Sequence, residues 1–220
     1  MRFKLLFLIP AALSVTMTSA FASEKTSLFM YGQNDIHGGT VIAKETAHVD
    51  AYGGANVEAY GQAVIKAFDT TTVVANGHTT VYAAADVKVT ALDNARVFAS
   101  NNADVDAAGS TSVYPSGNAK VIAHGNVQIF ATGNSVIKAY DDCSIMARDN
   151  VRIEASGNVT VLANGNVKIT AKDNVNIKAY GTTEIKAQDN VTIDAYDTTK
   201  VNATKTVKVE SHDNSKVSLN

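Results

Sequence analysis

The sequence predicts an all-β fold, a single-chain β-solenoid in which two octad strands form each coil. Three observations indicate this fold. Residues 37–220 divide into 23 consecutive octads without insertion or deletion. The fifth octad position is Val or Ile in all 23 copies. Apolar residues at the sixth position recur in every second octad over the middle of the chain. A fixed repeat of this kind determines the architecture before any single residue is interpreted.

Each octad, numbered from position 1 to position 8, predicts one short strand and one corner. Position 7 is Ala in 20 of 23 copies, position 3 is small or β-branched, and positions 4 and 6 are mostly polar or variable. This alternation over five residues is typical of a half-buried strand and does not fit an amphipathic helix. Position 1 is Gly, Asp or Asn in 19 of 23 copies. These residues tolerate positive φ and bond to nearby backbone groups, so positions 8, 1 and 2 are expected to form a turn.

The spacing of like residues indicates how many octads make one coil. A five-residue strand cannot bury its apolar face alone, but copies stacked about 4.8 Å apart can. In a coil of two octads, residues 16 apart lie directly above one another. Opposite charges recur at that spacing in Lys168, Glu184 and Lys200, and Asn118 and Asn134 could begin an amide ladder. The sequence therefore predicts about 11.5 coils, stacked over roughly 55 Å.

The residues with most functional content form an outward column, which we call the apolar stripe. It occupies position 6 of alternate octads and consists of Tyr82, Phe98, Tyr114, Phe130, Met146 and Leu162. One interpretation is a ladder that stabilises its own sheet through cross-strand pairs. The other is an interface for a second rod, a saccharide surface or a partner protein, because monomers rarely leave large apolar patches free.

Three segments are expected along the chain. Residues 1–22 resemble a signal peptide, with basic Arg2 and Lys4, an apolar run, and an A-x-A site ending at Ala22. The run is too short for a membrane span, so we expect an exported protein that is periplasmic, cell-surface or extracellular. Residues 23–36 break the octad pattern and are expected to form an N-terminal cap or a docking segment. Residues 37–220 are the octad-repeat β-solenoid.

The repeat is unusual at Pro115 and at its last coil. Pro115 replaces Ala at position 7, where we expect a bulge or a strand end. The repeat continues to Asn220, so the last coil could present an open strand edge. That edge would be either protected by its charged residues or used for end-to-end assembly.

Residues that could carry chemistry do not converge. Cys143, the single cysteine, falls at an inward position and is expected to be a buried core residue, with an intermolecular disulfide as the alternative. The five histidines share no column in neighbouring coils and are expected to be solvated corner residues. We expect no metal site, no cofactor and no catalysis, because uninterrupted octads leave no loops on which to build an active site. Without residues 1–22 the chain has 17 basic against 21 acidic residues, which disfavours nucleic acid as a partner.

Two resemblances bear on function. The octads from GNAKVIAH (117–124) to DNVTIDAY (189–196) resemble those of secreted bacterial proteins built from x-N-A-x-V-x-A-Y-like repeats. That resemblance implies a surface or matrix component. The octads also resemble those of triple-stranded β-helices in phage and type VI secretion spikes, which have V-x-G where this chain has V-x-A.

These observations together favour a non-enzymatic, secreted structural or adhesive repeat protein, such as a fibre or biofilm-matrix component. Its expected partners are further copies of itself, joined end to end or stripe to stripe, or a cell-surface polysaccharide. The alternatives are a solenoid that binds polysaccharide or ice, and a subunit of a trimeric triple-stranded β-helix spike.

Overall fold

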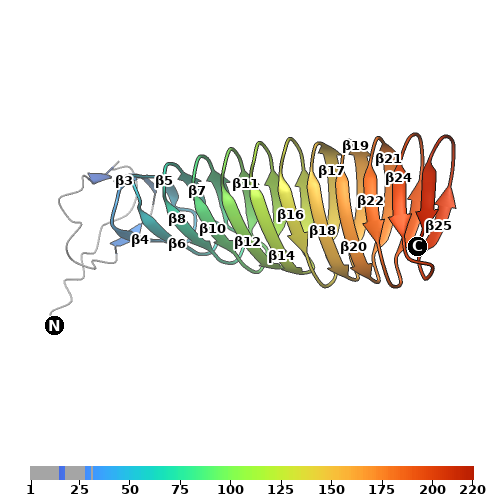
Figure 1. Ribbon diagram of the computed structural model, residues 1–220. Helices are drawn as coiled ribbons and strands as arrows, with labels where there is room; N and C mark the ends of the chain where they lie inside the picture. The colour runs from blue at the N-terminus through green and yellow to red at the C-terminus, as the bar shows by residue number, and fades with distance from the viewer. Residues whose placement is uncertain (1–14, 18–27, 31) are drawn as a thin grey trace. The chain divides into compact units, whose positions relative to one another are not determined.

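The computed structural model describes residues 15–17, 28–30 and 32–220. These residues form an all-β solenoid of about 12 turns with ~16-residue coils, as the sequence predicts. The chain divides into two compact units, Met1–Asp106 and Ala107–Asn220, here called unit 1 and unit 2. In each unit, odd-numbered strands form one parallel sheet and even-numbered strands form another, and Figure 1 shows the strands stacked coil upon coil.

The strands of unit 1 occur in two series. The odd-numbered strands are β1 (Val15–Met17), β3 (Gln33–His37), β5 (His48–Tyr52), β7 (Val64–Ala67), β9 (Thr80–Ala83) and β11 (Arg96–Ala99). The even-numbered strands are β2 (Leu28–Met30), β4 (Thr40–Ala43), β6 (Asn56–Ala59), β8 (Thr72–Ala75), β10 (Lys88–Ala91) and β12 (Asp104–Gly109), the last of which ends within unit 2.

Unit 2 repeats the same pattern. Its odd-numbered strands are β13 (Ser112–Pro115), β15 (Gln128–Ala131), β17 (Ser144–Asp149), β19 (Thr160–Gly165), β21 (Asn176–Gly181), β23 (Thr192–Ala195) and β25 (Lys208–Ser211). Its even-numbered strands are β14 (Lys120–Gly125), β16 (Val136–Ala139), β18 (Arg152–Gly157), β20 (Lys168–Asp173), β22 (Glu184–Ala187), β24 (Lys200–Ala203) and β26 (Lys216–Leu219). Pro115 ends β13, so the strand-end expectation is confirmed.

The strand register confirms the two-octad coil. Ile145 pairs with Ile129 and Val161, and Ile153 pairs with Ile137 and Ile169, in each case two octads away. The offset is shorter where the repeat begins: Asn34 pairs with Val49, and Leu28 pairs with Val41. Strands therefore extend into the segment 23–36, but the coils there are irregular, since Val15 on β1 pairs with Asn34, 19 residues further on.

The N-terminal leader stays a prediction. Of residues 1–22 the structure describes Val15–Met17, which form β1 and pair with β3; the remaining residues lie outside the described part of the chain. Within the described residues, no helix has the length and apolar character that crossing a membrane requires.

The narrow core follows from the side-chain alternation. Val or Ile at position 5 and Ala at position 7 are almost completely buried through most of both units, as Ile65, Ala67, Ile153 and Ala163 illustrate. Position 3 completes the core, and its polar members are satisfied locally. Thr183 Oγ1, for example, donates to the Tyr180 carbonyl oxygen at 2.8 Å. No buried side-chain nitrogen or oxygen among the described residues lacks a hydrogen-bond partner, which is what a stable core requires.

The corners place position 1 at positive φ, where Gly and Asp predominate. Asp149 has φ 66°, and its Oδ2 accepts a hydrogen bond from the Gly133 backbone N–H at 3.1 Å. Asp141 makes the same bond to Gly125, and Asp197 to Gly181. We expected these side chains to bond to the local backbone; they instead join one coil to the coil before it.

Side chains at equivalent positions in successive coils of unit 2 also interact with one another. The expected amide ladder is present: the side-chain amides of Asn134, Asn150 and Asn166 each donate to the Asn one coil before, beginning at Asn118, at 3.2–3.5 Å. The expected charge column is present too, with Glu184 between Lys168 at 3.6 Å and Lys200 at 3.9 Å.

The corner bond predicts a graded response to substitution at Asp149. Asp149→Ala removes the bond to Gly133 and leaves a side chain that disfavours positive φ, so it should lower the free energy of unfolding by about 1–2 kcal/mol. Asp149→Asn keeps an oxygen acceptor and tolerates positive φ, so its unfolding midpoint in urea should stay close to that of the parent. Equal losses for the two variants would contradict a corner held by this acceptor.

Candidate functional site

The apolar stripe lies on the odd-numbered strands of both units. In unit 1, Tyr82 on β9 and Phe98 on β11 are register partners, and their rings stack with centroids 5.0 Å apart and planes 8° apart. In unit 2, Tyr114 on β13 and Phe130 on β15 stack in the same way, at 5.0 Å and 9°. Since sheet strands repeat about every 4.8 Å, equivalent rings in successive coils meet at stacking distance.

The stripe continues in unit 2 with two aliphatic residues. Met146 on β17 is the register partner of Phe130, and Leu162 on β19 is the register partner of Met146. Phe130, Met146 and Leu162 are each 37% exposed, and in unit 1 Tyr82 is 45% exposed. In unit 1 the structure therefore brings together Tyr82 and Phe98 as an outward column on one sheet. In unit 2 it brings together the other four residues of the stripe in the same way.

The residues at octad positions 4 and 6 on the strands of the unit 2 column carry no charge. We call these residues of β13, β15, β17 and β19 the neutral face: Ser112, Tyr114, Gln128, Phe130, Ser144, Met146, Thr160 and Leu162. Charged residues stand at its edges, with Arg148 near the end of β17 and Lys178 as the register partner of Leu162. On the even-numbered strands β14, β16, β18 and β20, five of the side chains at the same two positions are charged: Lys120, Lys138, Arg152, Glu154 and Lys168. The column therefore lies in a neutral patch with charged residues at its edges.

Ring ladders at the corners are a feature that the sequence analysis recognised only in part. The spacing of Tyr180 and Tyr196 suggested a contact, and their rings stack at 4.8 Å. The ladder continues to His212, 4.4 Å from Tyr196, and His212 is an exposed corner residue as expected. His124 likewise stacks on Tyr140 at 4.8 Å, and His37 on Tyr52 at 4.9 Å. For His124 and His212 the signal was a Tyr 16 residues away, whereas His37 and Tyr52 are 15 residues apart and gave no such signal.

The described residues contain no group of three or more His, Cys, Asp or Glu side chains placed to hold a metal ion. Several corner carboxylates accept from backbone N–H groups, as Asp93 does from Gly77 at 3.2 Å. Others accept from Asn side chains, as Asp142 does from Asn158 at 3.0 Å.

Comparison with known proteins adds one assignment. Residues 53–211 match the model of a family described as "Uncharacterized protein conserved in bacteria (DUF2345)". The match covers most of the chain and most of its coils. The chain belongs to this family. No curated protein and no solved structure matches it.

The coils of this DUF2345 protein differ from those of a triple-stranded β-helix. Register partners in each sheet lie two octads apart in the same chain, and residues such as Ile137 and Ile153 are fully buried without a second chain. The fold therefore closes its core within one polypeptide.

The cysteine of this DUF2345 protein is part of the core. Cys143 is 1% exposed, and its thiol donates to the Tyr140 carbonyl oxygen at 2.9 Å. Burial raises the pKa of the Cys143 thiol, so the reactive thiolate is scarce at neutral pH. The buried-core interpretation of this residue is confirmed.

Cys143 should consequently react with a thiol reagent only when unit 2 opens. At pH 8 the native chain should label at least a hundredfold more slowly than the urea-unfolded chain, because both access and thiolate formation are restricted. The measurement is the rate of colour development with an aromatic disulfide reagent. Rapid labelling of folded protein would contradict the buried position.

Proposed function

We propose that this chain is a non-enzymatic structural or adhesive protein, and that the neutral face of unit 2 is its contact surface. The observation that carries the proposal is the column of Tyr114, Phe130, Met146 and Leu162, whose neighbours at octad position 4 on the same strands are all uncharged. Scattered apolar residues on a surface need no explanation, but a contiguous column does. The neighbouring Ser, Thr and Gln side chains are mostly short, so they would not hold a partner away from the column.

The regularity of the coils supports a passive role. Catalytic residues are disproportionately found on loops that a rigid scaffold positions. In the described residues from β5 to β25, each strand is joined to the next by a short corner of nearly constant length. Such a protein would contact its partners through columns of side chains that lie at equivalent positions in successive coils.

A second copy of the chain is the partner that fits the neutral face best. Two neutral faces have the same strand spacing, so the side chains of one copy fit between those of the other. The charged residues, such as Arg148 and Lys178, lie at the edges of the face and can stay in water when the neutral residues meet. Four strands of about five residues cover about 300 Å². Because a standard stable interface buries about 800 Å² per partner, we expect weak, reversible pairing that gains strength when many copies assemble.

The proposed location follows from the leader expected over residues 1–22. Export would deliver the chain to the periplasm, the cell surface or the extracellular matrix, where a stiff, self-associating solenoid serves as a spacer or an adhesive component.

The proposal predicts that the neutral face controls self-association. Replacing Phe130 and Met146 together with Ser should abolish the concentration-dependent increase in sedimentation coefficient that we expect of the parent chain. Ile122 is the matched control, because it is 43% exposed at the same octad position on β14, one of the even-numbered strands. Ile122→Ser should sediment like the parent.

Circular dichroism would verify that the variants keep the fold. A parent chain that stays monomeric at millimolar concentration would contradict self-association. A double Ser variant that associates as the parent does would exclude the neutral face as the contact surface.

A further inference from the structure

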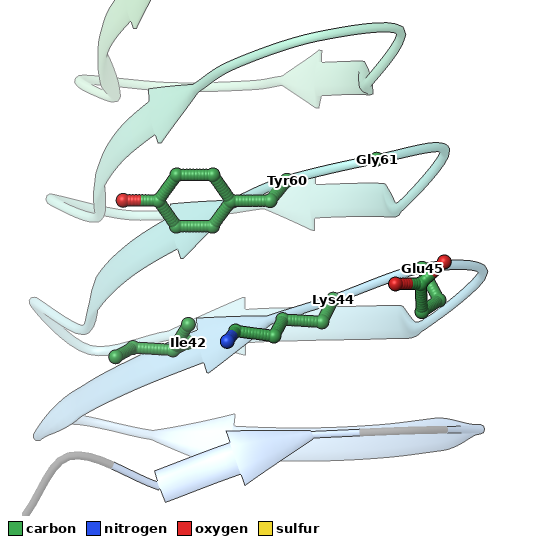
Figure 2. Close-up of a pocket in the computed structure, with 5 residues that line it drawn as sticks. All are labelled: Ile42, Lys44, Glu45, Tyr60 and Gly61. Atoms are coloured by element: carbon green, nitrogen blue, oxygen red, sulfur yellow. The ribbon is translucent and has the colours of Figure 1, made fainter.

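A hollow of about 370 Å³ lies on the even-numbered side of unit 1, where the chain leaves β4 and β6. Its lining residues are Ile42, Lys44, Glu45, Tyr60 and Gly61, which Figure 2 shows on two successive coils. This volume lies near the lower end of the range for small-molecule sites, which is about 300–1,000 Å³.

Gly61 lets the two corners beside the hollow approach closely. It has φ +72°, and a Cβ added to it would lie 3.2 Å from the Cα and backbone N of Glu45 in the coil before. Figure 2 shows the ring of Tyr60 above the Lys44 side chain, with Glu45 at the corner end of the hollow.

The Tyr60 ring differs from the ring ladders. Its neighbours one coil away on either side are Lys44 and Asn76, which have no aromatic rings. Tyr60 is 40% exposed. Rings such as Tyr196 are instead stacked between two other rings. Tyr60 thus offers an apolar ring face to a ligand, with a polar tip at its end.

The polar groups around the ring both donate and accept hydrogen bonds. The Tyr60 hydroxyl donates to Glu58 Oε2 at 3.2 Å, which leaves the phenol oxygen to accept. Burial, and then the nearby Glu58 carboxylate, raise the pKa of Tyr60, so the hydroxyl keeps its proton at neutral pH. Lys44 contributes an ammonium donor, and Glu45 contributes a carboxylate acceptor.

Glu45 occupies a backbone position that normally takes another residue type. Its φ is 55°, and apart from Ala85 and Asn101 every other non-glycine residue with positive φ in the described chain is Asp. Asp tolerates this conformation because its short side chain bonds to nearby backbone groups, whereas Glu does so less readily. Backbone strain of this kind clusters at functional sites. At this corner the strained residue is Glu45, which places a carboxylate on a longer side chain than that of Asp at the rim of the hollow.

We propose that the hollow binds one sugar residue of a neutral polysaccharide, with the apolar face of the sugar against Tyr60 and its hydroxyls bonded to Lys44 and Glu45. A neutral sugar has an apolar ring face that can stack on Tyr60 and hydroxyls that can bond to both the positive Lys44 and the negative Glu45. A polyanion would meet Glu45 and Glu58, and a polycation would meet Lys44. The site belongs to unit 1 and is independent of the neutral face of unit 2, so either proposal can fail without the other.

Saturation-transfer NMR with the full chain and two probes, cellotetraose and chitotetraose, tests the proposal. At least one probe should receive saturation from the protein and bind with a dissociation constant of about 1 mM, as expected for a small open site. Tyr60→Ala should weaken binding about tenfold. Tyr82→Ala is the matched control, because Tyr82 is 45% exposed on the opposite sheet of unit 1, and it should bind like the parent.

Glu45→Asp separates a binding role from a structural one. Asp suits positive φ better, so this variant should unfold at a higher temperature than the parent, while its shorter carboxylate weakens sugar binding at least threefold. A purely structural Glu45 would give the thermal change without the loss of binding. The proposal is overturned if neither sugar receives saturation, if Tyr60→Ala binds like the parent, or if Glu45→Asp leaves binding unchanged.

Discussion

The hydrogen bonds between successive coils are the interaction on which the rest of the structure depends. In unit 2, for example, Thr160 N–H donates to the Cys143 carbonyl oxygen at 3.0 Å, and Asn176 N–H donates to the Val159 carbonyl oxygen at 2.9 Å. These bonds fix each residue above its equivalent in the coil before. A shift by one residue would turn every Val and Ile from the core to the solvent, so the apolar alternation and the hydrogen-bond register support each other.

Once the register is fixed, the chemistry of the protein is organised by columns. A residue type that recurs in successive coils becomes a continuous ladder, whether its members are amides such as Asn134 or rings such as Tyr196. Function is then expected where a column changes character. The neutral face of unit 2 is one such place, and the ring of Tyr60, whose neighbours one coil away are not aromatic, is another.

The sequence predicts the coil, the core and several ladders because each depends only on the period. It does not predict the irregular first coils, where Asn34 pairs with Val49, because they precede the regular octads. It also misses the inter-coil bonds of the corner Asp residues and the stacking of His124 on Tyr140, which depend on side-chain direction as well as spacing. The hollow beside Tyr60 depends on how the side chains of two particular coils lie, which a pattern of recurring residue types does not reveal.

The most direct test of this account measures which residues are neighbours in solution. In a Cys143→Ser background, spin labels at positions 138 and 154 should lie on adjacent strands of one sheet, about 4.8 Å apart at the backbone, and should give a strongly broadened electron paramagnetic resonance spectrum. Labels at 138 and 146 lie on opposite sheets and, at a dilution at which copies do not pair through the neutral face, should give narrow lines, as should a single label at 138. Broadening in the 138/146 pair, or in the singly labelled chain, would contradict a coil of two octads closed within one polypeptide.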